Sequence, residues 1–264
     1  MTFKDKIIWI TGASSGIGKH LAMVLSQYNA KLILSSRNEN DLKLVKAQCK
    51  NPDLVIIIPL DLENTVTFKQ KTETAINSFG HIDILVNNGG VSQRSLAKNT
   101  TFEVDKRIIN INYLGTVALT KAILPHFIAR QAGQFVVTTS IVGKIGTPFR
   151  SSYAASKHAL HGFFDSLRAE VFSDNIQVTI VCPGFVKTNV SINALTGNGT
   201  AQKTMDIATK NGIKPEQFAK VMAKAIYNKK QEVYIAGFKE KLGVFTKRFF
   251  PKLLSKMIRK LSVT

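Results

Sequence analysis

Short runs of apolar and β-branched residues recur along the chain, separated by longer segments whose apolar positions return every three or four residues. The short runs predict seven strands, at Ile7–Ile10, Lys31–Ser35, Leu54–Pro59, Ile84–Val86, Gln134–Thr138, Gln177–Val181 and Glu232–Ile235. The longer segments predict helices, among them Gly16–Tyr28, Asn38–Lys50, Thr65–Phe79 and Thr101–Arg130. Continuously apolar strands that alternate with helices indicate a parallel sheet covered on both faces. We therefore expect an α/β fold with a doubly wound sheet of about seven strands.

No repeat, low-complexity stretch or Pro/Gly-rich linker divides the chain, so we expect a single domain over residues 1–237. Within it, residues 188–214 are polar and rich in Gly and Asn, which is typical of a substrate lid or another binding loop. The composition changes again after Gly237, and residues 238–264 form a separate tail.

The tail has an amphipathic helical pattern. Its apolar stripe comprises Leu242, Phe245, Phe249, Leu253, Met257 and Leu261, with Phe250, Leu254 and Ile258 beside it. Eight basic residues face one acid, Glu240, and Pro251 is expected to divide the tail into two helices. This composition favours an interfacial helix on an anionic membrane surface. The alternative is that the stripe packs on the body of the protein or across a dimer.

Net charge and cysteine content bear on which partners the protein binds and in which compartment it is found. The net charge is +19, but no zinc-finger spacing, RNA-binding aromatic motif or arginine-rich arm is present, so we expect no nucleic acid partner. The two cysteines, far apart, indicate a reducing compartment without disulfides. With no signal peptide and no apolar run of about 18 residues, we expect a cytoplasmic protein without a spanning helix, and the tail leaves a peripheral position at the membrane open.

A Gly-rich turn follows the first predicted strand, in the sequence Thr-Gly-Ala-Ser-Ser-Gly-Ile-Gly that ends at Gly18. Gly12, Gly16 and Gly18 would let the chain turn tightly and bring backbone N–H groups close to a pyrophosphate at the start of a helix. Their spacing, G-x-x-x-G-x-G, differs from the commonest dinucleotide fingerprint, G-x-G-x-x-G.

Tyr153 and Lys157 lie four residues apart in Ser-Ser-Tyr-Ala-Ala-Ser-Lys, so on a helix they share one face. An ammonium beside a phenol favours the phenolate and is expected to lower the pKa of Tyr153 from about 10 toward working pH. Such a phenol can donate or accept a proton in carbonyl and alcohol chemistry.

The Gly-rich turn and the later Tyr-x-x-x-Lys together resemble the short-chain dehydrogenase/reductase family, over residues 4 to about 237. The resemblance implies a Rossmann-type fold and hydride transfer between a nicotinamide cofactor and a carbonyl/secondary alcohol pair. It implies that Tyr153 acts as general acid/base, that Ser140 binds the substrate oxygen, that Lys157 also holds the nicotinamide ribose, and that Asn112 holds a water near the lysine. The cofactor residues it implies are Gly12, Ser14, Ser15, Gly16, Ile17, Gly18, Asp61, Leu62, Asn88, Gly90, Tyr153, Lys157, Pro183, Gly184, Val186 and Thr188. Gly89 departs from the family's pattern, which has Ala there, and we expect added local flexibility.

The end of the second strand bears on which dinucleotide binds. Ser36 occupies the place where an acid would accept hydrogen bonds from a ribose 2′-hydroxyl, and Arg37 follows it. A guanidinium pairs well with a 2′-phosphate, which favours NADP(H) over NAD. Ser15 is neutral, however, where NADP-preferring members of the family often carry a second basic residue, and Arg37 could instead lie on a solvated helix start.

The substrate pocket is expected to be mostly apolar, lined by Val142, Phe149, Phe185, Val186 and the lid near Ile192–Leu195, which suits a lipophilic small-molecule substrate. Arg94 and Arg150 could instead favour an acidic headgroup, or lie in solvent. His126, His158 and His161 are expected to be surface or interface residues, and no metal is expected. Non-catalytic readings also stay open: an NADP-binding regulatory protein, or an RNA- or lipid-binding module that keeps the fold. The family resemblance implies a homodimer or homotetramer.

Overall fold

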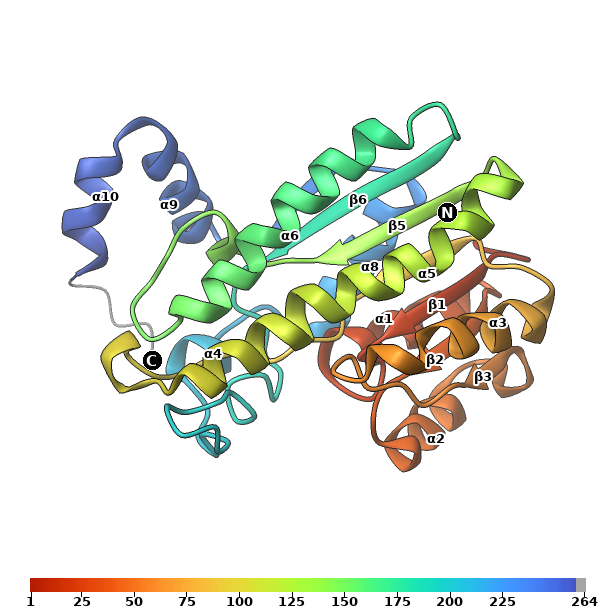
Figure 1. The fold of residues 1–264 in the computed structure, drawn as a ribbon, viewed down its shortest axis with the longest axis horizontal. Coiled ribbons are helices and arrows are strands. Elements are labelled where there is room, and N and C mark those ends of the chain that lie inside the picture. Colours follow the sequence, from red (N-terminus) through yellow and green to blue (C-terminus); the bar gives the residue numbers. More distant parts are fainter. Residues whose placement is uncertain (260–264) are drawn as a thin grey trace.

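The computed structural model describes residues 1–259 and contains one sheet of seven parallel strands in the order β3-β2-β1-β4-β5-β6-β7 (Figure 1). The strands are β1 Ile7–Thr11, β2 Lys31–Ser35, β3 Val55–Ile57, β4 Ile84–Asn87, β5 Gly133–Thr138, β6 Ile176–Pro183 and β7 Glu232–Ile235. The predicted α/β fold and all seven predicted strands are confirmed. β3 is shorter than predicted because Pro52–Leu54 forms a 3-10 turn before it.

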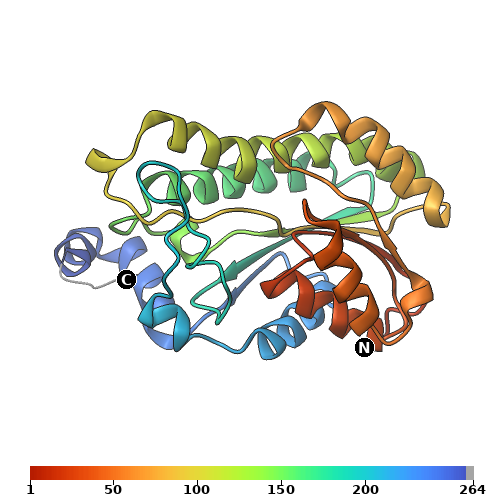
Figure 2. The ribbon, with the colours of Figure 1, turned by 90° about the horizontal axis from the view of Figure 1, so that it is seen from below.

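Helices cover both faces of the sheet, which is why the strands lack an alternating pattern (Figure 2). One face carries α1, α2 and α8, and the other carries α3, α5 and α6. The bounds are α1 Gly16–Gln27, α2 Glu39–Gln48, α3 Phe68–Phe79, α4 Phe102–Ile109, α5 Gly115–Arg130, α6 Ser151–Glu170, α7 Ile207–Lys210, α8 Pro215–Tyr227, α9 Phe238–Phe249 and α10 Pro251–Ile258. All five residues of β1 are buried between the two layers.

The segment predicted as one helix over Thr101–Arg130 is a continuous helix with an internal irregularity. A π-helical turn, Asn110–Leu114, joins α4 to α5. π-turns insert an extra residue and are frequent at functional sites. Asn112 lies in this turn and is completely buried.

The same continuous helix, Phe102–Arg130, is the one helix in the described part of the chain whose length and composition would allow it to cross a membrane. The expectation of a chain without a spanning helix stays a prediction, because this criterion rests on length and composition alone. Leu119, Ile123 and Phe127 are completely buried against the sheet. Core helices of globular proteins meet the same criterion, so the finding is weak evidence of a membrane span.

Residues 188–214 contain little regular structure and lie against the loop that follows β4. Backbone hydrogen bonds join Arg94 N to Leu195 O at 2.8 Å and Leu195 N to Ser92 O at 2.9 Å. The short helix α7 lies near the end of the segment. Of the predicted tail, Lys260 and Leu261 lie outside the described residues.

Candidate active site

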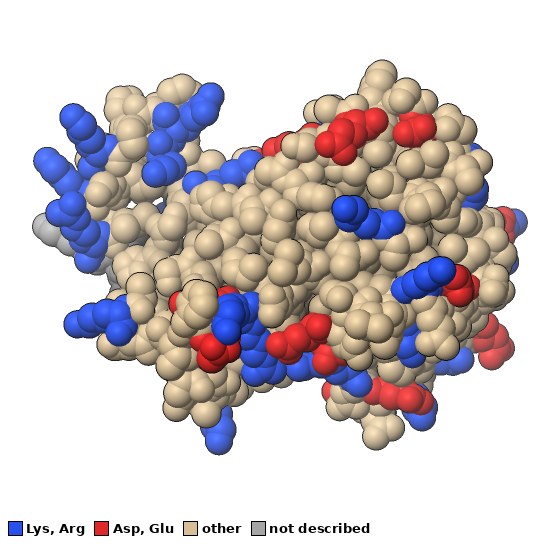
Figure 3. All heavy atoms as spheres, in the orientation of Figure 1, with Lys and Arg blue, Asp and Glu red and all other residues tan. Residues whose placement is uncertain are grey.

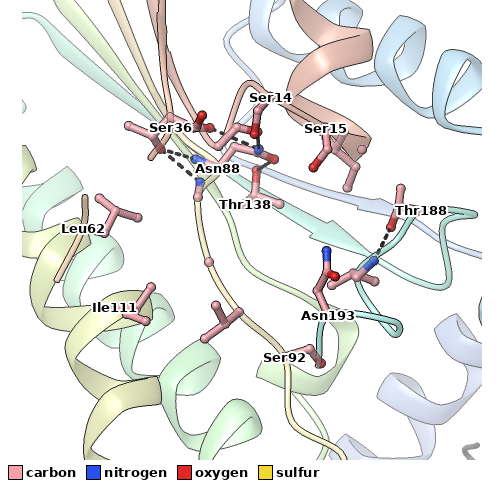
Figure 4. Close-up of a pocket in the computed structure, with 18 of the residues that line it drawn as sticks. Ser14, Ser15, Ser36, Leu62, Asn88, Ser92, Ile111, Thr138, Thr188 and Asn193 are labelled. Carbon is pink, nitrogen blue, oxygen red and sulfur yellow. Dashed lines mark hydrogen bonds between the residues drawn. The ribbon is translucent and has the colours of Figure 1, made fainter. Parts of the chain in front are cut away.

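A cavity of about 1040 Å³ opens at the carboxyl ends of the strands, where ligands bind in doubly wound sheets. Leu62 and Ile111 border it on one side, and Thr188 and Asn193 on the other (Figure 4). Most of the residues predicted for the site line this cavity: Gly12, Ser14, Ser15, Gly16, Ile17, Ser36, Arg37, Asp61, Leu62, Asn88, Gly90, Ser140, Tyr153, Lys157, Pro183, Gly184, Val186 and Thr188.

The Gly-rich turn needs glycine for two physical reasons. Gly12 and Gly16 have φ of 63° and 52°, in the left-handed region that glycine adopts without strain. A Cβ on Gly18 would lie 2.3 Å from the carbonyl oxygen of Gly12, so Gly18 lets α1 pack tightly against the turn. Gly18 does not line the cavity, and its role is therefore one of packing.

Asn88 ties the Gly-rich turn to the neighbouring strands. Its Nδ2 donates to the carbonyl oxygens of Thr11 and Gly12 at 3.2 and 3.3 Å. The hydroxyl of Thr138 donates to Asn88 Oδ1 at 3.3 Å, and Thr11 Oγ1 accepts from Asn88 N at 3.0 Å. Thr11 and Thr138 were not predicted, although each ends a strand beside a predicted residue.

Gly89, where the family has Ala, packs closely. A Cβ there would lie 2.7 Å from Leu62 Cδ1 and 3.4 Å from Thr11 Oγ1, whereas the glycine leaves that space to the Leu62 side chain. Thr11 Oγ1 also accepts a hydrogen bond from Gly89 N at 3.0 Å. The missing methyl thus makes room for a residue predicted to contact the adenine.

The part of the cavity near the end of β2 contains both a basic and an acidic side chain. Arg37 is exposed and Ser36 is half-buried, and both line the cavity. Asp41, in the first turn of α2, lines it as well and was not predicted. Because a carboxylate repels a phosphate, Asp41 opposes the preference that Arg37 favours.

The predicted reactive groups meet at the floor of the cavity. Lys157 is 5% exposed, and its Nζ lies 5.8 Å from the ring centroid of Tyr153 and donates to Thr138 O at 2.8 Å. Burial lowers the pKa of Lys157 to about 8. Ser140 is hydrogen-bonded with Tyr153 and precedes the short turn Ile141–Gly143.

The pKa of Tyr153 moves in the direction opposite to the one expected from the sequence. Burial raises it, because desolvation disfavours the phenolate. The hydrogen bond with Ser140 lowers this pKa in part, and the charges of Arg150 and Arg94 lower it further. Sequence reasoning did not identify these two guanidinium groups as charges acting on Tyr153.

Asn112 lies behind the cavity and does not line it. Its Oδ1 accepts from Val91 N at 2.8 Å, and its Nδ2 donates to Val91 O at 2.9 Å and to Ser156 Oγ at 3.0 Å. A Cβ on Gly90 would lie 2.9 Å from Asn112 Oδ1 and 3.6 Å from Lys157 Nζ. Asn112 therefore fixes the loop after β4 against α6, next to the lysine.

The residues predicted to line a substrate pocket do not all do so. Val142, Phe149 and Phe185 are half-buried and lie outside the cavity lining. The ring of Phe185 is covered by the Arg150 guanidinium, whose Cζ lies 5.8 Å from its centroid. The lid residue Leu195 does line the cavity, as do the unpredicted Ile111, Val91, Val190 and Ala201, so an apolar contribution comes from the lid and the π-turn.

Arg94 and Arg150 are buried, which excludes the expectation that they lie in solvent. Arg94 Nε donates to Asp206 Oδ2 at 2.8 Å, and Arg150 Nη2 lies 3.7 Å from the same oxygen. Their side chains are 5% and 4% exposed, and that of Asp206 is 1% exposed. This cluster joins the lid to the loop after β4 and to the start of α6.

A second group of titratable residues lies outside the cavity. His161, Cys182 and Glu232 have ligand atoms within 4.8 Å of one another, and His161 Nε2 is 3.8 Å from Cys182 Sγ. Lys144 Nζ already pairs with Glu232 at 3.1 Å. His161 is buried, contrary to expectation, whereas His158 is exposed and His126 Nε2 accepts from Ile82 N at 3.2 Å.

Comparison with known proteins agrees with this geometry. A family model described as short chain dehydrogenase matches residues 6–199. The chain is 40% identical over 261 residues to a dehydrogenase/reductase SDR family protein 7-like of Anopheles gambiae, covering 97% of this chain and 82% of the relative. It is 39% identical over 257 residues to the dehydrogenase/reductase SDR family member 7B of Danio rerio, covering 95% and 83%.

Solved structures share the fold. A short chain dehydrogenase/reductase from Burkholderia phymatum in complex with NAD has a TM-score of 0.83 at 21% identity, covering 96% of each chain. An alcohol dehydrogenase from Thermococcus sibiricus, complexed with 5-hydroxy-NADP, has a TM-score of 0.75 at 23% identity, covering 88% of this chain and 96% of that one. Both nicotinamide dinucleotides thus occur among proteins of this fold.

Proposed function

Because this chain belongs to the short-chain dehydrogenase family, we propose that it is an NADP(H)-dependent oxidoreductase acting on a carbonyl/secondary alcohol pair. The observation that supports this most strongly is that one cavity is lined both by the Gly-rich turn and by Ser140, Tyr153 and Lys157. The substrate is a lipophilic small molecule, since Ile111, Leu195 and their neighbours supply apolar surface beside these groups.

The residues of the cavity fit a dinucleotide. Gly12 and Gly16 line the cavity and carry no side chain that would keep a phosphate from their backbone, and α1 begins at Gly16. When bound, the dinucleotide donates or accepts the hydride. Ser14, Ser15 and Ile17 belong to the same turn, and Asp61 and Leu62 border the adenine side. Pro183, Gly184, Val186 and Thr188 lie near the reactive end.

Tyr153 is the general acid of the reduction. Its raised pKa keeps the phenol protonated at neutral pH, so it has a proton to give to the developing alkoxide. Ser140 donates a hydrogen bond to the same substrate oxygen. Lys157 contributes positive charge below its pKa of about 8 and would hold the ribose hydroxyls of a bound dinucleotide. Asn112 holds the loop that borders this lysine and helps to position the water that returns a proton to the tyrosine.

The preference for NADP(H) rests on Arg37 and Ser36, which line the cavity at the end of β2. A guanidinium pairs with a phosphate more strongly than a neutral donor does. Asp41, in the first turn of α2, lines the same cavity and would weaken this preference.

Replacing the proposed acid tests the assignment. In Tyr153→Phe we expect NADPH to bind with unchanged affinity while turnover falls by about two to four orders of magnitude, as for loss of a general acid. The measurements are NADPH fluorescence titration and NADPH oxidation with a panel of lipophilic ketones, β-keto acyl thioesters and quinones. Near-normal turnover in Tyr153→Phe would contradict the assignment of Tyr153 as the general acid.

A non-catalytic, NADP-binding regulatory protein is the second candidate. It requires dinucleotide binding but no proton relay, and the joint burial of Asn112 and Lys157 beside Tyr153 disfavours it. Tight NADPH binding without turnover of any panel substrate, unchanged in Tyr153→Phe, would favour this candidate. By analogy with the family we also propose a homodimer or homotetramer, which sedimentation velocity tests.

A further inference from the structure

The last two helices expose an unusual amount of apolar surface. We call the outward side chains of α9 and α10 the tail surface. Seven large apolar residues on it are between 45% and 79% exposed: Phe238, Leu242, Phe245, Phe249, Phe250, Leu253 and Met257. The rings of Phe245 and Phe249 lie 4.7 Å apart, so these two side chains form a contiguous apolar surface on α9. Contiguous exposed apolar patches of this kind mark contact with a partner or a membrane.

Basic side chains surround these apolar residues. Every lysine and arginine of the described tail is exposed: Lys239, Lys241, Lys247, Arg248, Lys252, Lys256 and Arg259. Figure 3 shows the tail helices as a blue cluster at one end of the molecule. The one acid of the tail, Glu240, points inward, where its Oε1 accepts from Phe185 N at 3.3 Å. The outward face is therefore uniformly cationic.

The inner side of the tail is already packed on the body of the protein. Leu254 is 5% exposed and lies in a cluster with Ile141 and Ile145, against which Val244 and Ile258 also pack. The alternative that the tail packs on the protein itself thus accounts for the inner row of apolar residues. It leaves the outer row, which includes Phe245, Phe249 and Leu253, more than half exposed.

We propose that the tail surface docks onto an anionic lipid membrane, with its apolar side chains in the headgroup–acyl boundary and its ammonium and guanidinium groups on lipid phosphates. The positive charge of the tail surface distinguishes between the two possible partners, a second copy of the chain and an anionic bilayer. Docking onto the same surface of a second copy would place two uniformly cationic faces against each other, which is unfavourable, whereas an anionic bilayer complements the face.

The docking surface lies next to the substrate side of the cavity. α9 and α10 pack on Ile141 and Ile145, in the segment that directly follows Ser140. Docking would therefore place this end of the cavity close to the bilayer, where a lipophilic substrate dissolves. This consequence rests on the proposed function, whereas the docking itself does not.

Co-sedimentation with vesicles tests the docking. The full chain is expected to sediment with vesicles that contain phosphatidylserine, to bind pure phosphatidylcholine vesicles weakly, and to be released by added salt. The double variants Phe245→Ser/Phe249→Ser and Lys252→Glu/Lys256→Glu should each weaken binding about ten-fold or more. Both should keep the wild-type affinity for NADPH, which shows that they fold.

Matched controls lie elsewhere on the surface. Phe172 is 84% exposed, and Lys220 and Lys224 are exposed on α8. Phe172→Ser and Lys220→Glu/Lys224→Glu should bind vesicles within about two-fold of the wild type, since screening limits their effect. The proposal is overturned if these controls lose as much binding as the tail variants, or if no protein sediments with anionic vesicles. It is also overturned if the tail variants turn a stable oligomer into monomers without changing vesicle binding.

Discussion

At the scale of single residues, the site combines groups whose positions the sequence reveals with groups that only the fold brings near. Tyr153 and Lys157 could be chosen from their spacing, because the Tyr-x-x-x-Lys pair shares one helix face, whereas Ser140 could be chosen only from the family resemblance. The direction in which the pKa of Tyr153 is shifted could not be predicted. The shift depends on how deeply the ring is buried and on charges such as that of Arg94, which precedes Tyr153 by 59 positions.

The choice of dinucleotide turns on Arg37. In Arg37→Ala we expect the Kd for NADPH to rise about ten-fold and that for NADH to stay constant, because only the 2′-phosphate loses its partner. In Asp41→Asn the Kd for NADPH should fall. Fluorescence titration with both dinucleotides measures this, with Lys43→Ala as a control on the exposed side of α2. An unchanged ratio of the two affinities in Arg37→Ala would show that Arg37 does not select the cofactor.

His161 makes the stability of the fold depend on pH. Burial, together with the nearby charge of Lys144, lowers its pKa to about 4 from the ordinary histidine value of 6.5. The unfolded chain therefore binds a proton between about pH 6.5 and 4 that the folded protein does not, so the free energy of unfolding falls as the pH drops through this window. The loss is up to about 3 kcal/mol.

Urea denaturation across this pH range tests the assignment. His161→Gln should flatten the acid side of the stability curve, whereas His158→Gln, at an exposed position of the same helix, should leave it as in the wild type. If the free energy of unfolding depends on pH equally in the wild type and His161→Gln, another residue causes the acid sensitivity.

At the scale of elements, the lid is held by one buried carboxylate. Asp206 lies 112 positions after Arg94, and it also accepts from Gln202 Nε2 at 3.0 Å. Sequence reasoning found the lid from its composition but could not pair these residues, because nothing in the spacing of two distant polar residues indicates contact. Val142 and Phe149 were wrongly assigned to the cavity for a similar reason. The sequence indicates that an apolar side chain is buried, but it does not indicate toward which part of the protein that side chain points.

Removing that carboxylate tests how the lid is fixed. Asp206→Asn removes the buried carboxylate that pairs with Arg94 and lies 3.7 Å from Arg150 Nη2, and we expect it to cost about 3–5 kcal/mol of stability and to speed proteolysis within residues 188–214. Asp165→Asn breaks an exposed pair with Arg168 and should cost about 0.5 kcal/mol or less. Equal effects of the two substitutions would contradict a structural role for the Arg94–Asp206–Arg150 cluster.

At the scale of the whole molecule, the fold could be predicted in nearly every element. Parallel strands buried on both faces are continuously apolar, and turns separate them cleanly from amphipathic helices, so the order of elements determines a doubly wound sheet. The π-turn at Asn110–Leu114 could not be predicted, since it differs from an α-helix by one inserted residue in an unbroken apolar pattern. Its consequence is local, because the turn contains Asn112, which donates to Ser156 Oγ behind the cavity.

The central claim is that this cavity transfers a hydride from NADPH to a carbonyl under proton donation by Tyr153. The most direct measurement follows deuterium from NADPH labelled at the nicotinamide C4 into the alcohol product by mass spectrometry, for the wild type and Tyr153→Phe. We predict a labelled secondary alcohol from at least one lipophilic ketone with the wild type and almost none with the variant. Equal labelling by both proteins, or binding of NADPH without any labelled product across the panel, would contradict the account.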